Sequence, residues 1–424
     1  MPETAVRFHA EQQALGNGAQ LLYKHLPGAP RMALSIFLPG GNQLDTVPGL
    51  SDVVDRLVPK GTKTRSKEQI SIDIDSLTLE VDTDTKRDYN LMFATLLEED
   101  LDASLALMAD LFYNAELSET EFEREKEKIT GEVHMDLDAP KSRASDLFVR
   151  SLFGNTPYSA VSSVILENLD RINDVGVIRK HYQQAYRSDN AIISVVGDIQ
   201  QNKIAEKLAH YFPASQASGP VERVPSLAKL KDLKIAKDEV VSFARDDSSQ
   251  AHIFKGWLAP DARHADYSPL AVLNTILGAG GLSSRLFVEL RDKQGLAYNV
   301  RSSFETFEHK GMFYLYIGTE PSNKEKCLQG FITECQKLID TAVSEKELAD
   351  AKRNILGKRA VFLETASQQA NYIGANVVMG RTLADIEQLP DRIAAVTAAD
   401  IQRVAQQYLT QPSITAVVGP SSIL

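Results

Sequence analysis

The sequence has very little cysteine, too little for a framework of disulfide bonds. Cys327 and Cys335 are the only cysteines among 424 residues, and no C-x-x-C pair occurs. Two such thiols are typical of a reducing compartment, where free cysteine is usually buried. The opening residues MPETAVRFHAEQQ also lack the basic start and apolar run of a secretory signal. We therefore expect a cytoplasmic protein.

Long apolar runs and an excess of positive charge are also missing. No run approaches the ~18 apolar residues of a membrane span, so we expect no membrane association. The formal net charge of -11 disfavours nucleic acid and anionic membranes as partners. The chain is 43% hydrophobic and 24% charged, which is ordinary for a globular protein. Its 424 residues predict two or three domains.

The chain contains an internal repeat. QAYRSDNAIISVVGD starts at Gln184, and QQYLTQPSITAVVGP, which matches it without a gap, starts at Gln406. SETEFEREKEKITGE at Ser118 and SEKELADAKRNILGK at Ser344 repeat at nearly the same offset. Both of the latter open with Ser-x-x-Glu, the pattern of a helix capping box. Two matches at almost one offset predict a duplicated unit of roughly 200 residues, the size of one domain.

A segment rich in Pro, Ser and Gly (213–226) separates the two copies. We predict an N-terminal domain over 1–212, a linker over 213–236 and a C-terminal domain over 237–424. Strands such as MALSIFLPG (32–40) and GMFYLYIGTE (311–320) mix with long amphipathic helices, without a strict β-α-β rhythm. This mixture favours an α+β fold with an antiparallel sheet packed with helices in each copy.

The stretch GLSDVVDRLVPKGT (49–62) predicts a helix with one apolar face, because its apolar residues recur at helical spacing. Its polar positions are Asp52, Asp55 and Arg56. Asp52 and Arg56 have the spacing of a side-chain pair, and an exposed pair of this kind contributes only about 0.5 kcal/mol.

In its frame this stretch resembles the signature helix of the pitrilysin/insulinase family, the inverzincin metallopeptidases. That helix follows Gly-Leu, carries H-x-x-E-H and ends near Lys-Gly-Thr; its two His bind zinc and its Glu polarises the attacking water. Here Asp52 stands at the first His position, Asp55 at the Glu position and Arg56 at the second His position. A permanent cation at Arg56 cannot replace a neutral imidazole.

The resemblance also places two carboxylates on a later helix. Glu132 takes the position of the third zinc ligand, and Glu125 that of a second family carboxylate seven residues earlier. With one of three ligands retained, we expect no metal or other cofactor in this chain. Glu125 and Glu132 would then pair with Arg56 or with other cations. An independent metalloenzyme using Asp52 and Glu132 is disfavoured by the same arginine.

The second copy carries GAGGLSSRLFVELRDKQGLAYNV, starting at Gly278. It predicts a helix with Leu286, Phe287 and Leu290 inward, ended by Gly295, and a strand from about Ala297. On these residues alone, Arg291 is a cation near a helix end and Tyr298 a half-buried strand aromatic.

The same segment resembles the R-x-x-x-x-x-x-Y element of the family, with Arg291 and Tyr298 in the functional positions. In the family these side chains reach a zinc site held by another domain. The resemblance implies that Arg291 fixes a peptide carbonyl or carboxylate and that Tyr298 donates to the oxyanion of the transition state. It spans the whole chain and implies a fold like that of the mitochondrial processing peptidase.

Two functions follow from the resemblance. In the first, the chain is the R/Y subunit of a heterodimeric zinc peptidase, inactive alone, whose homologous partner carries H-x-x-E-H and the zinc. The pair would enclose and hydrolyse short or unfolded peptides. In the second, the chain is a non-catalytic peptide-binding or scaffold member of the family. The sequence favours the first, because a purely structural role gives no reason to keep Arg291 and Tyr298 together in their frame.

Overall fold

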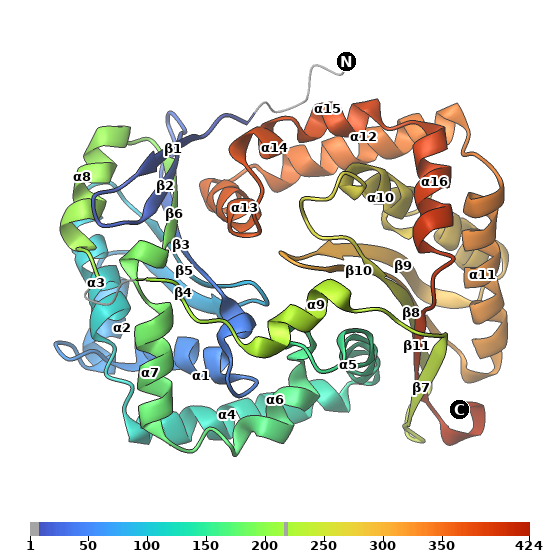
Figure 1. The fold of residues 1–424 in the computed structure, drawn as a ribbon, viewed down its shortest axis with the longest axis horizontal. Helices are drawn as coiled ribbons and strands as arrows, with labels where there is room; N and C mark the ends of the chain where they lie inside the picture. The colour runs from blue at the N-terminus through green and yellow to red at the C-terminus, as the bar shows by residue number, and fades with distance from the viewer. Residues whose placement is uncertain (1–7, 216–218) are drawn as a thin grey trace.

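The computed structural model describes residues 8–215 and 219–424, and it contains two β-sheets side by side (Figure 1). The first sheet has six strands in the order β1-β2-β6-β3-β5-β4. The second has five strands in the order β7-β11-β8-β10-β9. The strands are β1 (Glu11–Ala14), β2 (Gln20–His25), β3 (Met32–Pro39), β4 (Glu80–Thr85), β5 (Tyr89–Leu96), β6 (Ile192–Gly197), β7 (Glu239–Ala244), β8 (Ala251–Ala259), β9 (Ala297–Thr306), β10 (Gly311–Thr319) and β11 (Ile414–Gly419).

The two sheets share one topology, which confirms the α+β fold and the duplication. Apart from β1, each strand of the first sheet has a counterpart at the same place in the second. The expectation of antiparallel sheets needs one correction in each copy. Strand β6 runs parallel to β2, and β11 runs parallel to β7. The last strand of each copy returns from far along the chain, and it lies between β2 and β3 in the first sheet and between β7 and β8 in the second. Such long crossovers permit parallel pairing.

Helices surround both sheets. In the first half they are η1 (Gly41–Leu44), α1 (Leu50–Leu57), α2 (Lys67–Ser76), α3 (Leu101–Asn114), α4 (Glu119–Asp138), α5 (Pro140–Phe153), α6 (Ser162–Leu169), α7 (Val175–Ala185) and α8 (Gln201–Tyr211). Helix α9 (Lys229–Asp232) follows in the connection between the halves. The second half has α10 (Tyr267–Asn274), η6 (Thr275–Ala279), η7 (Phe287–Lys293), α11 (Lys324–Asp340), α12 (Glu345–Phe362), α13 (Ala366–Val378), α14 (Leu383–Glu387), α15 (Leu389–Ala395) and α16 (Ala398–Tyr408).

Strand β3 is apolar along its whole length because both of its faces are covered. Alternate side chains of a strand point to opposite faces. Leu34 and Ile36 belong to the main core of the first half. On the other face, the Ser35 hydroxyl donates to Asn371 of α13 (2.7 Å), and Phe37 packs in a cluster with Val378. A continuous apolar run is the expected pattern for a strand buried on both sides.

The two halves exchange one helix each. Helix α13 comes from the second half and packs on β3 and β6 of the first sheet. Helix α5 comes from the first half and packs on β8 and β11 of the second sheet, where Phe148 lies 5.6 Å from Tyr314 between ring centres. Figure 1 shows each of these helices beside the other half's sheet. The exchange joins the halves through buried apolar surface.

Two hairpin turns, one from each half, also meet. Asp88 in the β4–β5 turn accepts hydrogen bonds from the Tyr158 hydroxyl and from the backbone N–H of Glu308 in the β9–β10 turn (2.9 Å). The backbone N–H of His309 donates to Tyr158 (3.1 Å). Asp88 and Tyr158 are buried, and burial raises the pKa of the Asp88 carboxyl. This buried polar contact fixes the two turns against each other.

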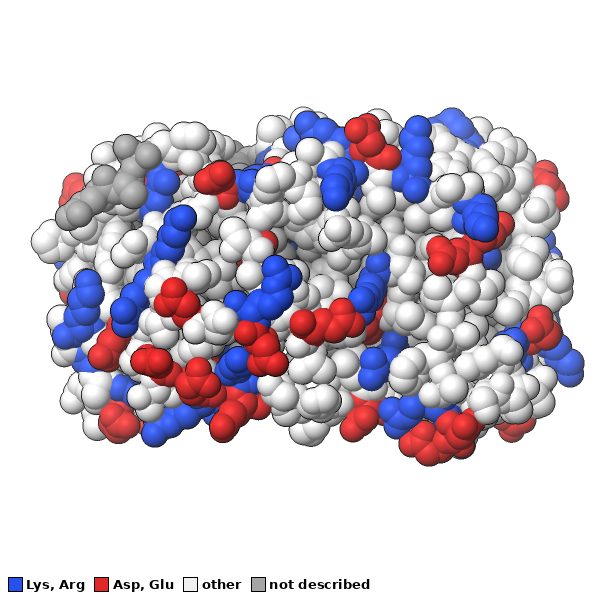
Figure 2. Space-filling view, turned by 60° about the horizontal axis from the view of Figure 1, so that its bottom comes forward, with Lys and Arg blue, Asp and Glu red and all other residues white. Residues whose placement is uncertain are grey.

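The domain limits at 212 and 237 stay a prediction, and residues 216–218 of the expected linker lie outside the described residues. Across residues 8–215 and 219–424, no helix is long and apolar enough to cross a membrane. On the face drawn in Figure 2, acidic side chains gather along the lower part, with Lys and Arg interspersed among them. That face carries no extended basic area of the kind that binds nucleic acid.

Candidate functional site

The helix predicted over 49–62 is α1, and its N-terminus is held by a buried aspartate. Gly49 precedes the helix with a φ of 91°, a conformation that favours glycine. Asp45 accepts hydrogen bonds from the backbone N–H of Ser51 (2.8 Å) and of Gly49 (3.2 Å), two donors that a helix leaves without partners. The apolar face is buried as predicted, through Leu50, Val53, Val54, Leu57 and Val58.

Asp45 belongs to a buried network that the sequence did not reveal. The Ser51 hydroxyl donates to Asp45 (2.6 Å), and His181 Nε2 of α7 lies 2.9 Å from the same hydroxyl. Burial raises the pKa of Asp45 to about 7 and lowers the pKa of His181 to about 4. Asp45 lies four residues before the N-cap Gly49, and His181 lies 130 residues from Ser51, so no local pattern points to either residue.

Asp55, at the position of the family's general base, is buried and fully engaged. It accepts hydrogen bonds from Thr85 (2.6 Å), Asn90 (2.8 Å) and Tyr186 (2.7 Å). Burial raises its pKa to about 6, while these three donors act in the opposite direction. Three protein donors hold this buried carboxylate in place, so it ties α1 to the sheet and to Tyr186.

Asp52 lies at the first ligand position and is half-buried. Its closest hydrogen-bonding group is the Asn42 side chain, at 3.5 Å. Burial raises the pKa of Asp52 to about 7, and the neighbouring charge of Asp55 adds to this, while Arg56 lowers it. Asp52 forms no ion pair with Arg56 within the described residues, so the pairing expected from their spacing is wrong.

Arg56 pairs instead with Glu132 of α4, 2.7 Å away, and this contact raises the pKa of the guanidinium. By the resemblance, these two residues would take the positions of the second His and of the third zinc ligand. Glu125 is buried and contacts Lys128 (2.6 Å) and Lys60 (3.3 Å). Burial opposes its charge, but the two lysines outweigh that effect and lower the pKa of Glu125. Both glutamates thus pair with cations, as the sequence predicted.

These residues do not fit a zinc ion. Asp52 offers one oxygen ligand, Arg56 can only donate hydrogen bonds, and the Glu132 carboxylate is already paired. Within residues 8–215 and 219–424, no group of three or more His, Cys, Asp or Glu side chains could hold a metal ion. That the chain carries no zinc remains a prediction.

The R/Y segment lies in the second half, on η7 and β9. Leu286 and Leu290 are buried as predicted, but Phe287, also expected to point inward, is half-buried and lines a pocket. Gly295 ends the helix with a φ of 62°. Strand β9 begins at Ala297 as expected. Unlike the ordinary helix we expected, η7 is wound as a π-helix, and so is η6 just before it. π-Turns are rare and frequently occur at functional sites.

Arg291 and Tyr298 lie side by side. The guanidinium of Arg291 is 5.0 Å from the centre of the Tyr298 ring and 4.6 Å from that of Phe287. Tyr298 is 84% exposed, which corrects the half-buried position expected from its strand alone. Both side chains line a pocket of about 540 Å³, and Gly278 lines it too, where an added Cβ would lie 2.2 Å from Ser302 N. The close approach of η6 to β9 therefore requires glycine.

A half-buried ion pair anchors this segment. Arg285 makes two hydrogen bonds to Glu347 of α12, at 2.7 and 2.8 Å. Glu347 had been expected to complete a capping box with Ser344. The Ser344 side chain does accept from the backbone N–H of Glu347 (3.2 Å), but the Glu347 carboxylate goes to Arg285 instead. At the other copy Ser118 caps in the same way, while Glu121 pairs with Arg124 and Lys67.

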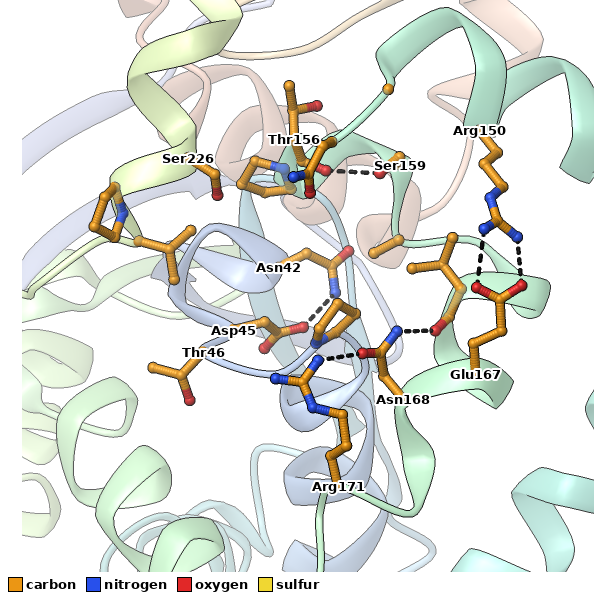
Figure 3. A pocket seen from close by; sticks show the side chains of 18 residues that line it. Asn42, Asp45, Thr46, Arg150, Thr156, Ser159, Glu167, Asn168, Arg171 and Ser226 are labelled. Carbon is orange, nitrogen blue, oxygen red and sulfur yellow. Dashed lines mark hydrogen bonds and ion pairs between the residues drawn. The ribbon is translucent and has the colours of Figure 1, made fainter.

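A larger pocket of about 740 Å³ opens beside the N-terminus of α1 (Figure 3). Its labelled polar side chains point mostly toward one another. Arg150 makes two bonds to Glu167 (2.6 and 2.9 Å), and Arg171 donates to Asn168 (2.7 Å). Asn42 donates to Asp45 (3.2 Å). Since these groups satisfy one another, the pocket offers few free groups to a ligand.

The two sites belong to different halves of one chain. In Figure 1, α1 lies with the sheet on the left and β9 with the sheet on the right. The structure brings Arg56 to Glu132 and Arg291 to Tyr298. Arg56 and Glu132 form an ion pair with each other, whereas Arg291 and Tyr298 line an open pocket.

Comparison with known families matches both halves. The family model described as insulinase (peptidase family M16) matches residues 21–161. The model described as peptidase M16 inactive domain matches residues 174–355. Together they extend over the α1 helix, the α4 helix and the R/Y segment.

Curated relatives of similar length are described as uncharacterized zinc proteases. One from Bacillus subtilis is 26% identical over 408 residues, covering 96% of this chain and 97% of the relative. One from Streptomyces coelicolor is 27% identical over 412 residues, covering 96% of this chain and 88% of the relative.

Solved structures share the fold. A peptidase M16 inactive domain from Pseudomonas fluorescens superposes with a TM-score of 0.88 at 20% identity, covering 98% of each chain. A protease from Helicobacter pylori gives 0.87 at 23% identity, covering 97% of this chain and 100% of that one. A chain of complex III2 from Candida albicans gives 0.80 at 15% identity, covering 96% and 95%.

Proposed function

Because the chain belongs to the insulinase (M16) family of peptidases, we propose that it is the zinc-lacking subunit of a two-chain zinc peptidase. In this proposal a homologous partner carries H-x-x-E-H and the zinc ion. This chain supplies Arg291 and Tyr298 to the hydrolysis of short or unfolded peptides.

The observation that carries the proposal is the contrast between the two sites. Around α1, Asp55 accepts three hydrogen bonds, Arg56 pairs with Glu132, and Glu125 contacts two lysines. Arg291 forms no ion pair, and the Tyr298 hydroxyl forms no hydrogen bond, within residues 8–215 and 219–424. Two free donors on an open pocket support a role toward a ligand that lies outside this chain's own fold.

The chemistry of the two side chains suits peptide hydrolysis. The planar guanidinium of Arg291 donates in a fixed fork, which fits a carboxylate or a peptide carbonyl. Stacking between Phe287 and Tyr298 limits its motion, so it presents this fork with less loss of entropy. The Tyr298 hydroxyl can donate to the oxygen that becomes negative when water attacks the scissile carbonyl. The partner's zinc would supply the activated water.

The test is reconstitution with the H-x-x-E-H homologue encoded by the same genome. Each chain alone and the mixed pair are assayed on quenched fluorescent peptides, with and without a chelator. We expect cleavage only by the pair. Tyr298→Phe should then lower kcat by about 10²–10³, the usual cost of one oxyanion donor. Arg291→Ala should lower kcat/KM through weaker substrate binding.

Tyr211→Phe, at a partly buried tyrosine of α8, is the matched control and should leave kcat unchanged. A pair that cleaves equally well with Tyr298→Phe and Arg291→Ala would falsify the proposed role of the R/Y segment. A complex that assembles but never cleaves would favour the non-catalytic scaffold function instead.

A further inference from the structure

A separate pocket lies where the connection between the halves runs past the second sheet. It measures about 630 Å³ and is formed by α9 and the residues after it, the end of β8, the β9–β10 turn and the end of α16. Figure 1 shows α9 between the two sheets. Its volume falls in the range of ~300–1,000 Å³ that is usual for small-molecule sites. Neither α1 nor the R/Y segment contributes to it.

Three lysines line this pocket without a partner. Lys231 and Lys234 come from the connection, and Lys310 from the β9–β10 turn. Within the described part of the chain, none of the three forms an ion pair or a side-chain hydrogen bond, whereas Lys60 and Lys128 both contact Glu125. Lys310 is half-buried, and burial lowers the pKa of its ammonium group. The positive charge of Lys234 lowers this pKa further, whereas the negative charge of Asp261 raises it.

The acidic groups near the pocket are already engaged. Asp261, on its wall, accepts from the backbone N–H of Arg263 (2.8 Å) and lies 3.6 Å from its guanidinium. Asp266 pairs with Arg403 (2.6 Å) and accepts from the Tyr408 hydroxyl (2.8 Å). Asp232 is exposed and acts on Lys310 only from a distance. Among the residues that line the pocket, Asp261 is the one acidic side chain, so it offsets only part of the charge of the three lysines.

The remaining wall is suited to the organic part of a ligand. Apolar side chains alternate with two imidazoles and an amide around the lysines. They are Leu233, Ile235, Leu258, Pro260, Pro412, His264, His309 and Gln411. An inorganic ion alone would leave most of this volume and all of this apolar surface unused.

We propose that this pocket binds a phosphorylated small molecule of nucleoside-phosphate size. Lysine is a common phosphate ligand because its ammonium group acts as a compact charge with three donors. A site built for a carboxylate more often uses the planar fork of arginine, and no arginine lines this pocket. The apolar wall would hold the base or sugar, and the three lysines the phosphate groups.

Such a ligand would join two parts of the chain. Lys231 and Lys234 lie on the connection, while Lys310 directly follows Glu308 and His309, which contact Asp88 and Tyr158. Neutralising three like charges would draw the connection and the turn together. The bound form should therefore resist unfolding more than the free form, by mass action on the folded state.

The test uses the whole chain and isothermal titration calorimetry at low and physiological salt, with ATP, inorganic phosphate and adenosine as separate probes. We expect one saturable site for ATP and at least about tenfold weaker binding of phosphate and of adenosine, since each lacks one half of the contacts. Lys310→Gln and Lys234→Gln should each weaken ATP binding by about tenfold, and higher salt should do the same.

Lys229→Gln is the matched control, since Lys229 lies on α9 but not on the pocket wall, and it should bind ATP normally. Circular dichroism of all variants checks that they fold. The proposal is overturned if ATP does not saturate a site, if adenosine binds as tightly as ATP, or if Lys310→Gln binds as well as Lys229→Gln. Phosphate binding as tightly as ATP would overturn the organic part of the assignment. No peptidase partner is needed, so these outcomes are independent of the function proposed above.

Discussion

The two candidate sites of this chain differ in what their polar side chains contact. Around α1, the carboxylate of Asp55 accepts three hydrogen bonds and Arg56 closes on Glu132. At η7 and β9, the guanidinium of Arg291 lies over two aromatic rings and Tyr298 is 84% exposed. The first region uses polar groups to hold the fold together, and the second presents them to solvent. A helix can thus keep the apolar and glycine positions of a metal-binding helix while its polar side chains stabilise the fold.

The strongest test of this comparison is to rebuild the metal site. Asp52→His together with Arg56→His removes the ion pair, frees Glu132 and supplies two imidazoles on one face of α1. Three ligands of this kind are a sufficient protein set for zinc, so the double variant should gain about one zinc ion per chain. Metal analysis after dialysis measures it, with wild type and Arg56→His alone as controls. A double variant that stays metal-free would show that α1 and α4 no longer hold these three side chains in a zinc-binding arrangement.

The second test compares stability at the two regions. Asp55→Ala leaves the Thr85, Asn90 and Tyr186 donors without a buried acceptor, which should cost about 2–4 kcal/mol in the free energy of unfolding. Tyr298→Ala removes an exposed side chain and should cost no more than about 0.5 kcal/mol. Urea unfolding followed by fluorescence measures both variants. A similar loss of unfolding free energy in both variants would show that the two regions contribute equally to stability, against this comparison.

The third test uses pH, because Asp45 and His181 titrate with opposite effects. The pKa of folded Asp45 is raised from 3.8 to about 7, so the folded state holds more protons in that range and stability falls as pH rises through it. The pKa of folded His181 is lowered from 6.5 to about 4, so stability rises with pH between those values. Asp52 and Asp55, raised to about 7 and about 6, add to the falling trend.

Relative to wild type, His181→Gln should therefore make stability fall more steeply between pH 4 and 7, and Asp45→Asn should make it fall less. Thermal melts across this range measure both slopes. If the two variants change the slope in the same direction, the assigned protonation of the network is wrong. The R/Y region has no such buried titrating network on the pocket wall, so Arg291→Ala should leave the slope as it is.

The smallest effect is expected for the ion pair itself. Arg56 and Glu132 are 38% and 55% exposed at their side chains, so solvent screens their attraction. Arg56→Ala and Glu132→Ala should each change the free energy of unfolding by about 0–1 kcal/mol. A double-mutant cycle in the same urea assay isolates the pair. A larger coupling would mean that the pair helps to hold α1 against α4.

Much of this architecture could be predicted from local pattern. The helical spacing of apolar residues predicted α1. The continuous apolar run at 32–40 predicted β3, because a strand buried on both faces is apolar throughout. The repeat predicted two equivalent sheets, and Gly295 marked the end of η7. The parallel pairs β2–β6 and β7–β11 could not be predicted, because pairing partners far apart in sequence leave no local signal.

The contacts of the candidate sites were less predictable than their positions. The cations around Glu125 and Glu132 were expected, since the lost ligands left carboxylates in need of a partner. For Arg56 the sequence left two partners open, Asp52 by helical spacing and the glutamates by resemblance, and only the structure shows that it pairs with Glu132, 76 residues further along the chain. The π-winding of η7 and the exposure of Tyr298 depend on packing against β9 and η6, which helical periodicity does not report.

The exchange of α5 and α13 has a consequence for synthesis on the ribosome. The outer face of β3 meets α13 through contacts such as Ser35 with Asn371, which are 336 residues apart. When the first half leaves the ribosome, the face of its sheet that α13 later covers is therefore still exposed. Helix α5 is exposed too, because the second sheet on which it packs has not yet been synthesised. The first half must stay unaggregated until the last quarter of the chain is translated, so we expect delayed release from chaperones to accompany any mutation that weakens α13.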